Sequence, residues 1–321
     1  MLKWKKLGQI FDPTKHRTSW MHHYSQNPNV LELEDRLRIY FTCRPERDQF
    51  GNCVSYTAYA DFEKAPPFKL LGVAESPVLQ LGGPGDFDEF GIMPGSLLNM
   101  KEKNEIWLYY VGWTRMHSVP YKWSNGLAIS KDNGRTFSRY SKGPVMSATF
   151  NDPYLQACPR AMRLDKSEFI MWYNAGTEWN LMDGHYESVY ITRFATSHDG
   201  INWSQNNRQV IPTIVPKECQ TSASYIRFND LNHIFFSYRH GLDFRNKENG
   251  YRIGYAYGDN FVDWTRADEM NDFTISDEGW DSEMVCYPHV IKLNGKIYMF
   301  YCGNNFGQNG FGVALLENGD Q

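Results

Sequence analysis

The strongest constraint on the fold of this chain is a fivefold repeat. A proline marks the same point in four copies and an alanine takes its place in one; the positions are Pro28, Pro94, Pro159, Ala223 and Pro288. The intervals between them are 66, 65, 64 and 65 residues. Such regular spacing is typical of a repeat architecture, in which each unit packs against its neighbours.

The five copies share one internal plan of strands and turns. A short strand follows the marker position, then a turn with Asp, Asn, Lys or Gly, and then an aromatic strand such as "EIWLYYVG" or "KIYMFYCGN". A third strand comes next, followed by a weaker fourth strand, for example at 208–212. Four antiparallel strands repeated radially form the blade of a β-propeller. The sequence therefore predicts an all-β, five-bladed propeller that spans residues 1–321 as a single domain.

The fifth copy lacks a fourth strand, because the sequence ends after the third. The segment "WKKLGQIFDP", from Trp4 to Pro13, resembles the fourth strands of the other copies and has no blade of its own. We expect this N-terminal strand to complete the fifth blade and close the ring, which would leave no exposed sheet edge there.

Composition narrows the class of protein further. Aromatic residues make up 16% of the chain, which favours a β-rich fold. The net charge of −4 comes without a basic stripe, so nucleic acid is not an expected partner. No apolar run approaches 18 residues and the N-terminus lacks a signal-peptide core, so no membrane span or secretion is expected. Six cysteines without CxxC pairs predict reduced thiols and a cytoplasmic location.

Acidic residues recur just ahead of the predicted inner strands. The five positions that precede the markers by five residues are His23, Glu89, Tyr154, Glu218 and Glu283, with Asp88, Asp152 and Asp281 close by. Since the first strand of each propeller blade lines the central axis, we expect these acids to converge at the mouth of one pocket. Clustered carboxylates raise one another's pKa, which is what glycoside hydrolysis needs of its acid and base.

The acidic positions, together with the basic and aromatic residues expected around them, give two sets of candidate site residues. The candidate catalytic carboxylates, with Glu218 or Glu283 as general acid and the others as base or substrate-orienting groups, are Glu89, Asp152, Glu218 and Glu283. The candidates for binding substrate hydroxyls, an anionic group or a sugar face are Asp88, Arg160, His289, Arg239, Arg44, His23 and Trp113. A structural role for these residues stays open as an alternative. An acid at a strand start is often an ion-pair partner, and Arg160 and His289 could form a structural pair. No HExxH-like spacing occurs, so no metal or other cofactor is expected.

The chain resembles the five-bladed propeller glycosidases of glycoside hydrolase families 43, 32, 68 and 130. The resemblance rests on the five repeats, the axial acids and the turn that contains Ser197, Asp199, Gly200 and Trp203. The segments "GDFDEFGIMP", "ECQ", "GYRIGYAY" and "DSEMVCYPH" are similar to glycosidase-like proteins of bacterial surface-polysaccharide clusters. The resemblance implies an enzyme that cleaves a bacterial oligosaccharide or sugar conjugate.

One departure from the family pattern keeps other functions open. Asn151-Asp152-Pro153 and Glu218-Cys219 resemble catalytic motifs of the fructosidase branch, but they fall on the third and fourth copies. The first copy reads "SQNPN", where most of the superfamily has an aspartate. A carbohydrate-binding propeller without activity is therefore one alternative, and a phosphate-dependent glycan phosphorylase is another.

Overall fold

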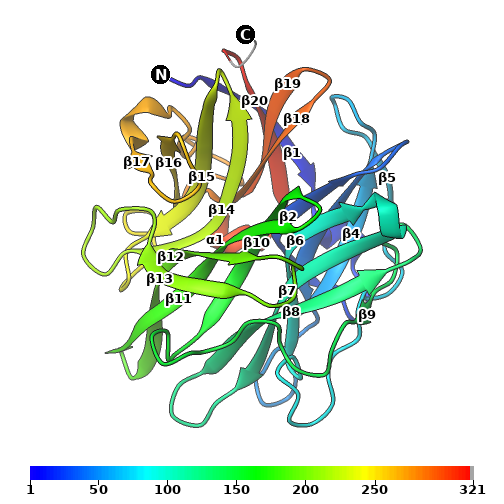
Figure 1. Cartoon of the computed structure of the whole chain (residues 1–321), viewed down its shortest axis with the longest axis vertical. Coiled ribbons are helices and arrows are strands. Elements are labelled where there is room, and N and C mark those ends of the chain that lie inside the picture. Colours follow the sequence, from blue (N-terminus) through cyan, green and yellow to red (C-terminus); the bar gives the residue numbers. More distant parts are fainter. Residues whose placement is uncertain (319–321) are drawn as a thin grey trace.

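Five four-stranded antiparallel sheets surround a common axis in the computed structural model, which describes residues 1–318 (Figure 1). The strands of the first three blades, from the axis outward, are β2 (His23–Glu32), β3 (Leu37–Arg44), β4 (Tyr56–Phe62) and β5 (Leu70–Val73); β6 (Gly91–Met100), β7 (Glu105–Arg115), β8 (Tyr121–Ser130) and β9 (Ser138–Arg139); and β10 (Gln156–Asp165), β11 (Glu168–Met182), β12 (His185–Ser197) and β13 (Ser204–Gln209). The predicted fold class, a five-bladed propeller with four antiparallel strands in each blade, is confirmed.

The N-terminal strand closes the ring, as predicted. The fourth and fifth blades consist of β14 (Cys219–Phe228), β15 (Leu231–Arg239), β16 (Arg252–Gly258) and β17 (Thr265–Arg266); and β18 (Cys286–Leu293), β19 (Lys296–Cys302), β20 (Phe311–Leu316) and β1 (Trp4–Phe11). In the fifth blade β1 pairs with β20, so the first and last strands of the chain lie side by side in one sheet (Figure 1).

Short helical segments join some of the strands. They are the 3-10 helices η1 (Pro13–His16), η2 (Lys101–Lys103) and η3 (Asp268–Met270), and α1 (Asn304–Gly307). In the described part of the chain no helix is long and apolar enough to cross a membrane. All six cysteines are free, and four of them are buried.

Aromatic side chains fill the wedges between blades. In residues 1–318, five clusters of buried apolar side chains occupy the five spaces between adjacent sheets. Between the fifth and first blades, for example, the Phe11 ring lies 4.9 Å from Phe41 and 5.3 Å from Phe311, centroid to centroid. Rings of this size bury large apolar areas, so the high aromatic content is explained mainly by blade-to-blade packing.

The turns after the third strands also join neighbouring blades. The Tyr109 hydroxyl of the second blade donates a 2.7 Å hydrogen bond to the Gly200 carbonyl of the third. Tyr40 of the first blade binds Gly134 of the second in the same way, at 2.6 Å. Gly200 has a φ of +74°, and a Cβ there would lie 2.8 Å from the Tyr109 hydroxyl. The Asp-Gly turn therefore requires glycine both for its backbone conformation and for this contact.

Candidate functional site

A cavity of about 400 Å³ opens where the five blades converge, and we call it the axial cavity. Every blade contributes to its wall, for example through Arg44, Trp113, Glu187, Arg239 and Tyr287 in chain order. A narrower chamber of about 130 Å³ shares part of this wall and continues along the inner strands. Pockets of this size, lined by aromatic rings with a few polar groups, are the usual form of small-molecule sites.

A buried arginine closes the axis beneath the narrow chamber. Arg160 on β10 is 6% exposed and donates to the side-chain oxygens of Asn27 and Asn29 on β2. Its Nη1 also lies 3.2 Å from Nδ1 of His289 on β18. Burial lowers the pKa of Arg160 to about 10, which leaves it charged at neutral pH. Arg160 and His289, predicted as substrate-binding residues, therefore contact each other. Arg160 also contacts Asn27, which lines the narrow chamber.

The contact with Arg160 has a consequence for acid stability. Burial, with the nearby Arg160 charge, lowers the pKa of His289 from 6.5 to about 3. Between pH 6.5 and pH 3, His289 is protonated in the unfolded chain but neutral in the folded chain. The free energy of unfolding should therefore fall as the pH falls from 6.5 toward 3. The contribution of this one group is at most ~1.4 kcal/mol per pH unit.

Comparing wild type with His289→Gln isolates this contribution. Carboxylates also contribute to acid denaturation, so the measured quantity is the difference between the two proteins in urea unfolding at pH 7 and pH 4.5. We expect the variant to lose less stability over this interval than wild type. Equal losses would show that His289 does not titrate as described.

Two arginines occupy the same place in opposite parts of the ring. Arg44 is the last residue of β3 and Arg239 is the last residue of β15, and each of these strands is the second strand of its blade. Arg239 is 4% exposed, with its guanidinium 3.4 Å from the Phe244 ring centroid and Nη1 2.7 Å from the His240 carbonyl oxygen. Arg44 lies over the Tyr24 ring at 4.8 Å. The Phe244 ring and the His240 carbonyl hold the Arg239 guanidinium in the cavity wall, and the Tyr24 ring packs against the guanidinium of Arg44.

Glu187 is the carboxylate in the wall of the axial cavity among residues 1–318. It stands near the start of β12, in the outer part of the long β11–β12 hairpin, and is 5% exposed. Its Oε1 accepts from Arg245 Nη1 at 2.5 Å and lies 2.9 Å from His185 Nε2. Because both contacts go to Oε1, the other oxygen is left for the cavity.

A second carboxylate stands at the rim. A space of about 410 Å³ adjoins the axial cavity and shares Arg44 with it; its wall includes Glu46 and His23. The Glu46 side chain is 75% exposed, and Oε1 lies 3.3 Å from Nε2 of His22. His22 in turn contacts His23 at 2.9 Å. Burial, followed by the neighbouring His22, lowers the pKa of His23, which favours its neutral form.

The acids predicted from the repeat do not line these cavities, and four of them are ion-paired within their own blades. Asp152 lies 2.9 Å from Arg193 on β12, and Glu218 lies 2.6 Å from Arg266 on β17. The predicted substrate-binding Asp88 follows the same pattern, 2.9 Å from Arg139. Asp281 does likewise, with Lys6 of β1 at 2.7 Å. These four acids therefore do not converge at one pocket as expected. Their side chains instead contact a cation on the third or fourth strand of their own blade.

The two remaining predicted acids also lie outside the cavity walls. Glu89 is half-buried and accepts a hydrogen bond from the Gly85 amide at 2.9 Å. Glu283 is exposed, and its backbone amide donates to Asn304. The catalytic assignment of Glu89, Asp152, Glu218 and Glu283 stays a prediction from sequence, without support from the position of the cavity.

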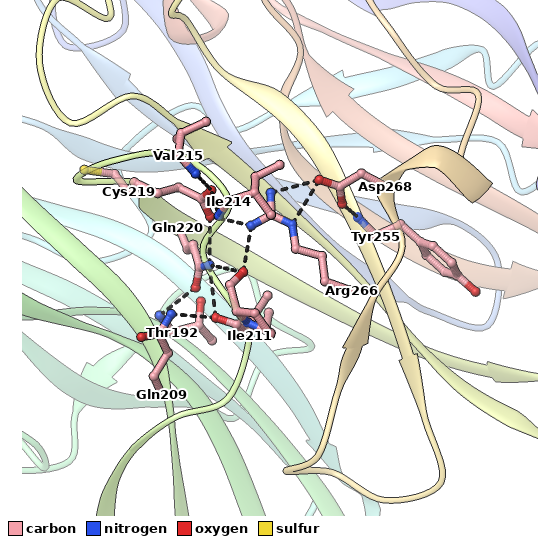
Figure 2. A network of polar contacts seen from close by, with 12 residues as sticks. Thr192, Gln209, Ile211, Ile214, Val215, Cys219, Gln220, Tyr255, Arg266 and Asp268 are labelled. Atoms are coloured by element: carbon pink, nitrogen blue, oxygen red, sulfur yellow. Dashed lines mark hydrogen bonds and ion pairs between the residues drawn. The ribbon is translucent and has the colours of Figure 1, made fainter.

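The network around Glu218 shows the structural role most fully. Its side chain is fully buried, and Oε1 accepts from both Arg266 and Gln220. Oε2 accepts from the Ile214 amide at 2.9 Å. Arg266 also binds Asp268, which lies 2.9 Å from Arg266 Nη2; Figure 2 shows these two side chains next to each other. The carboxylate thus joins the start of β14, the preceding loop and the outermost strand of the blade.

Some residues of the cavity wall were predicted from the sequence as site residues, and others, such as Glu187, were not. The structure brings Arg44, Arg239 and Trp113 to the axial cavity and His23 to the adjoining rim. Glu187 was missed because it does not stand at a repeat position. The available signal was the length of the third blade's hairpin, whose strands have 15 and 13 residues. The described residues contain no group of three His, Cys, Asp or Glu side chains arranged to hold a metal ion.

Comparison with known proteins places this geometry in a structural class. No family model matches the chain. A solved structure described as "Glycoside hydrolase" superposes with a TM-score of 0.76 at 19% identity, covering 97% of this chain and 91% of the other. A thermostable family-43 glycoside hydrolase gives 0.64 at 13% identity, covering 91% and 88%. A member of the GH130 family, described as containing mannoside phosphorylases and glycoside hydrolases, gives 0.64 at 14% identity, covering 98% and 93%. The chain therefore has the same propeller fold as these solved structures.

Sequence relatives define the family itself. Two proteins of Mycobacterium tuberculosis, "Uncharacterized protein Rv1502" of strain H37Rv and "Uncharacterized protein MT1551" of strain CDC 1551, are each 30% identical to this chain. Each match covers 99% of this chain and 100% of the relative. Because the similarity runs the length of both proteins, the chain belongs to the same family as Rv1502 of Mycobacterium tuberculosis.

Proposed function

We propose that this protein is an enzyme that cleaves a glycosidic bond of a bacterial glycan in the axial cavity. The observation that carries the proposal is one buried carboxylate, Glu187, in a wall lined with aromatic rings, with a solvated carboxylate, Glu46, at the adjoining rim. Glycoside hydrolysis uses such a pair of carboxyl groups in different environments. The fold shared with glycoside hydrolases supports the same assignment.

In this proposal the two carboxyl groups divide the proton transfers. Glu187, paired with the Arg245 cation, takes a proton from the water that adds to the anomeric carbon. Glu46 gives a proton to the glycosidic oxygen as its bond to that carbon breaks. Trp123 and Tyr121, whose rings stack at 4.5 Å and which lie in the cavity wall, offer a flat surface for a sugar ring.

Glycan binding without cleavage is the second candidate, and two observations favour it. Glu187 is already held by Arg245 and His185, as expected of a carboxylate with a structural or binding role. The inner strand of the first blade presents Gln26 and Asn27 to the narrow chamber, where a carboxylate would be needed for the common arrangement of the superfamily.

A turnover assay separates the candidates. The purified protein is incubated with a panel of aryl glycosides and surface-polysaccharide fragments, with and without inorganic phosphate. Release of sugar without phosphate supports hydrolysis, whereas release that requires phosphate moves the protein to the phosphorylases. Binding of fragments without any release would contradict the enzyme and leave a carbohydrate-binding propeller.

A further inference from the structure

The wall of the axial cavity carries more positive than negative charge. Four arginines line it, namely Arg44, Arg47, Arg239 and Arg245, against one carboxylate, Glu187. Arg245 is paired with Glu187 at 2.5 Å, so these two charges compensate each other. Three guanidinium groups remain. The chain as a whole has a net charge of −4, so this excess is local to the cavity.

In the described chain, a buried arginine away from the cavity has a carboxylate partner, whereas two buried arginines near the axis do not. Arg38, on the first blade away from the cavity, binds Asp61 at 2.7 Å. Arg160 and Arg239, which are equally buried, have only neutral acceptors among residues 1–318: amide, carbonyl and hydroxyl oxygens and an imidazole. The Nε atom of each is buried without a hydrogen-bond acceptor.

This arrangement is costly without a ligand. The free-energy cost of removing a guanidinium from water can be offset by a carboxylate partner, as Asp61 does for Arg38. Within residues 1–318, Arg239 has no such partner and lines the axial cavity. Arg44 shows the same lack: its Nη2 lies 3.3 Å from the Gln26 amide oxygen, and its Nε is buried without an acceptor.

We propose that the axial cavity binds an acidic glycan, whose carboxylate or other oxyanion lies against Arg44 and Arg239 while Arg160 adds positive charge from below. The guanidinium group is the side chain best suited to bidentate recognition of such anions. This inference rests on the proposed function of the cavity as a glycan site, and it names the substrate class.

The shape of the cavity favours an anion carried by a sugar over a free ion. The axial cavity has room for about 400 Å³, far more than an inorganic anion needs. The arginines are also set among rings: Arg239 lies over Phe244 at 3.4 Å and Arg44 over Tyr24 at 4.8 Å. Rings beside a cation provide an apolar face for a sugar next to a site for its acidic group.

Matched ligands test the charge directly. Oligomers of galacturonic acid and of galactose differ at one carbon, a carboxylate in place of a hydroxymethyl group; glucuronic and glucose oligomers form a second pair. Binding is measured by calorimetry on the full chain, with inorganic phosphate as a third probe. We expect the acidic member of at least one pair to bind about tenfold more tightly or better, because hydrogen bonds to a charged group are the stronger ones.

Matched variants test the site. Arg44→Gln, at a half-buried position, should abolish the preference for the acidic member, and Arg239→Gln should do the same if its thermal unfolding shows a folded protein. Arg135→Gln removes the same charge from an exposed position on the second blade outside the cavity walls, and should leave the preference unchanged. An equal loss in Arg135→Gln and Arg44→Gln would overturn the proposal, because it would show only a dependence on net charge.

The outcomes separate this inference from the proposed function. Equal binding of acidic and neutral oligomers, with turnover of a neutral one, overturns the acidic-glycan proposal and leaves the enzyme standing. Preference for an acidic oligomer through Arg44 without turnover supports the proposal and contradicts the enzyme. Binding of inorganic phosphate through Arg44, with cleavage of neutral glycans that requires phosphate, overturns the sugar-borne anion and assigns the arginines to a free co-substrate.

Discussion

Replacing Glu218 by glutamine is expected to lower the free energy of unfolding by about 3–5 kcal/mol, the usual effect of breaking a buried ion pair from one side. Glu218 and Arg266 have side-chain exposures of 0% and 4%, and they lie 2.6 Å apart. Glutamine keeps the shape of the side chain, but it removes the charge that offsets the buried guanidinium. Its amide nitrogen would also face a donor, either Arg266 or the Ile214 amide.

Urea unfolding of the variant measures this effect, and Glu283→Gln is the matched control. Glu283 was predicted from the same repeat position but is exposed, so its replacement should change the free energy of unfolding by no more than about 0.5 kcal/mol. If Glu218→Gln were as stable as wild type and inactive toward a glycan that wild type cleaves, the structural role would be contradicted. The sequence-based assignment of Glu218 as general acid would then stand.

Replacing Glu187 by glutamine is expected to lower the turnover of a cleaved glycan by about 10²–10⁴-fold, the range for losing a general acid or base. Glutamine can still accept the hydrogen bond from Arg245, so the position of the side chain should be kept. What the variant loses is the carboxylate oxygen that takes up a proton in the proposed mechanism. Binding of the glycan should therefore change much less than turnover, and the measurement is kcat beside the dissociation constant.

Glu178→Gln is the control for this experiment. Glu178 lies on the same hairpin, its side chain is 41% exposed, and it pairs with Lys217 at 3.7 Å outside the cavity wall. Its replacement should leave both turnover and binding unchanged. Full activity of Glu187→Gln would contradict the proposed role of Glu187 and return the search for the general base to the acids predicted from the repeat.

The fold could be predicted almost entirely from the sequence. Regular intervals between the marker prolines indicated five units, and alternating aromatic strands indicated four strands in each. The segment Trp4–Pro13 could be assigned to the last blade because a missing strand and an unassigned strand were both visible. Each inference depended on local patterns that repeat, and a repeated pattern fixes both the unit and its neighbours.

The site could be predicted only where a residue's place in the blade decides its surroundings. Arg44 and Arg239 end second strands beside the axis, so a blade model is enough to locate them. The acids ahead of the inner strands were placed near the axis for the same reason. Which way their side chains turn was decided by partners on other strands, such as Arg193 for Asp152 and Arg266 for Glu218.

The sequence by itself determined the repeat, the closure of the ring and the placement of the arginines at the axis. Only the tertiary structure decided that Asp88, Asp152, Glu218 and Asp281 are ion-paired within their own blades and that Glu187 lines the axial cavity. A buried carboxylate binds the nearest available cation, and which cation is nearest depends on strands that lie tens of residues away in the chain. Strand patterns show where a backbone runs, whereas the partner of a charged side chain is set by packing between strands.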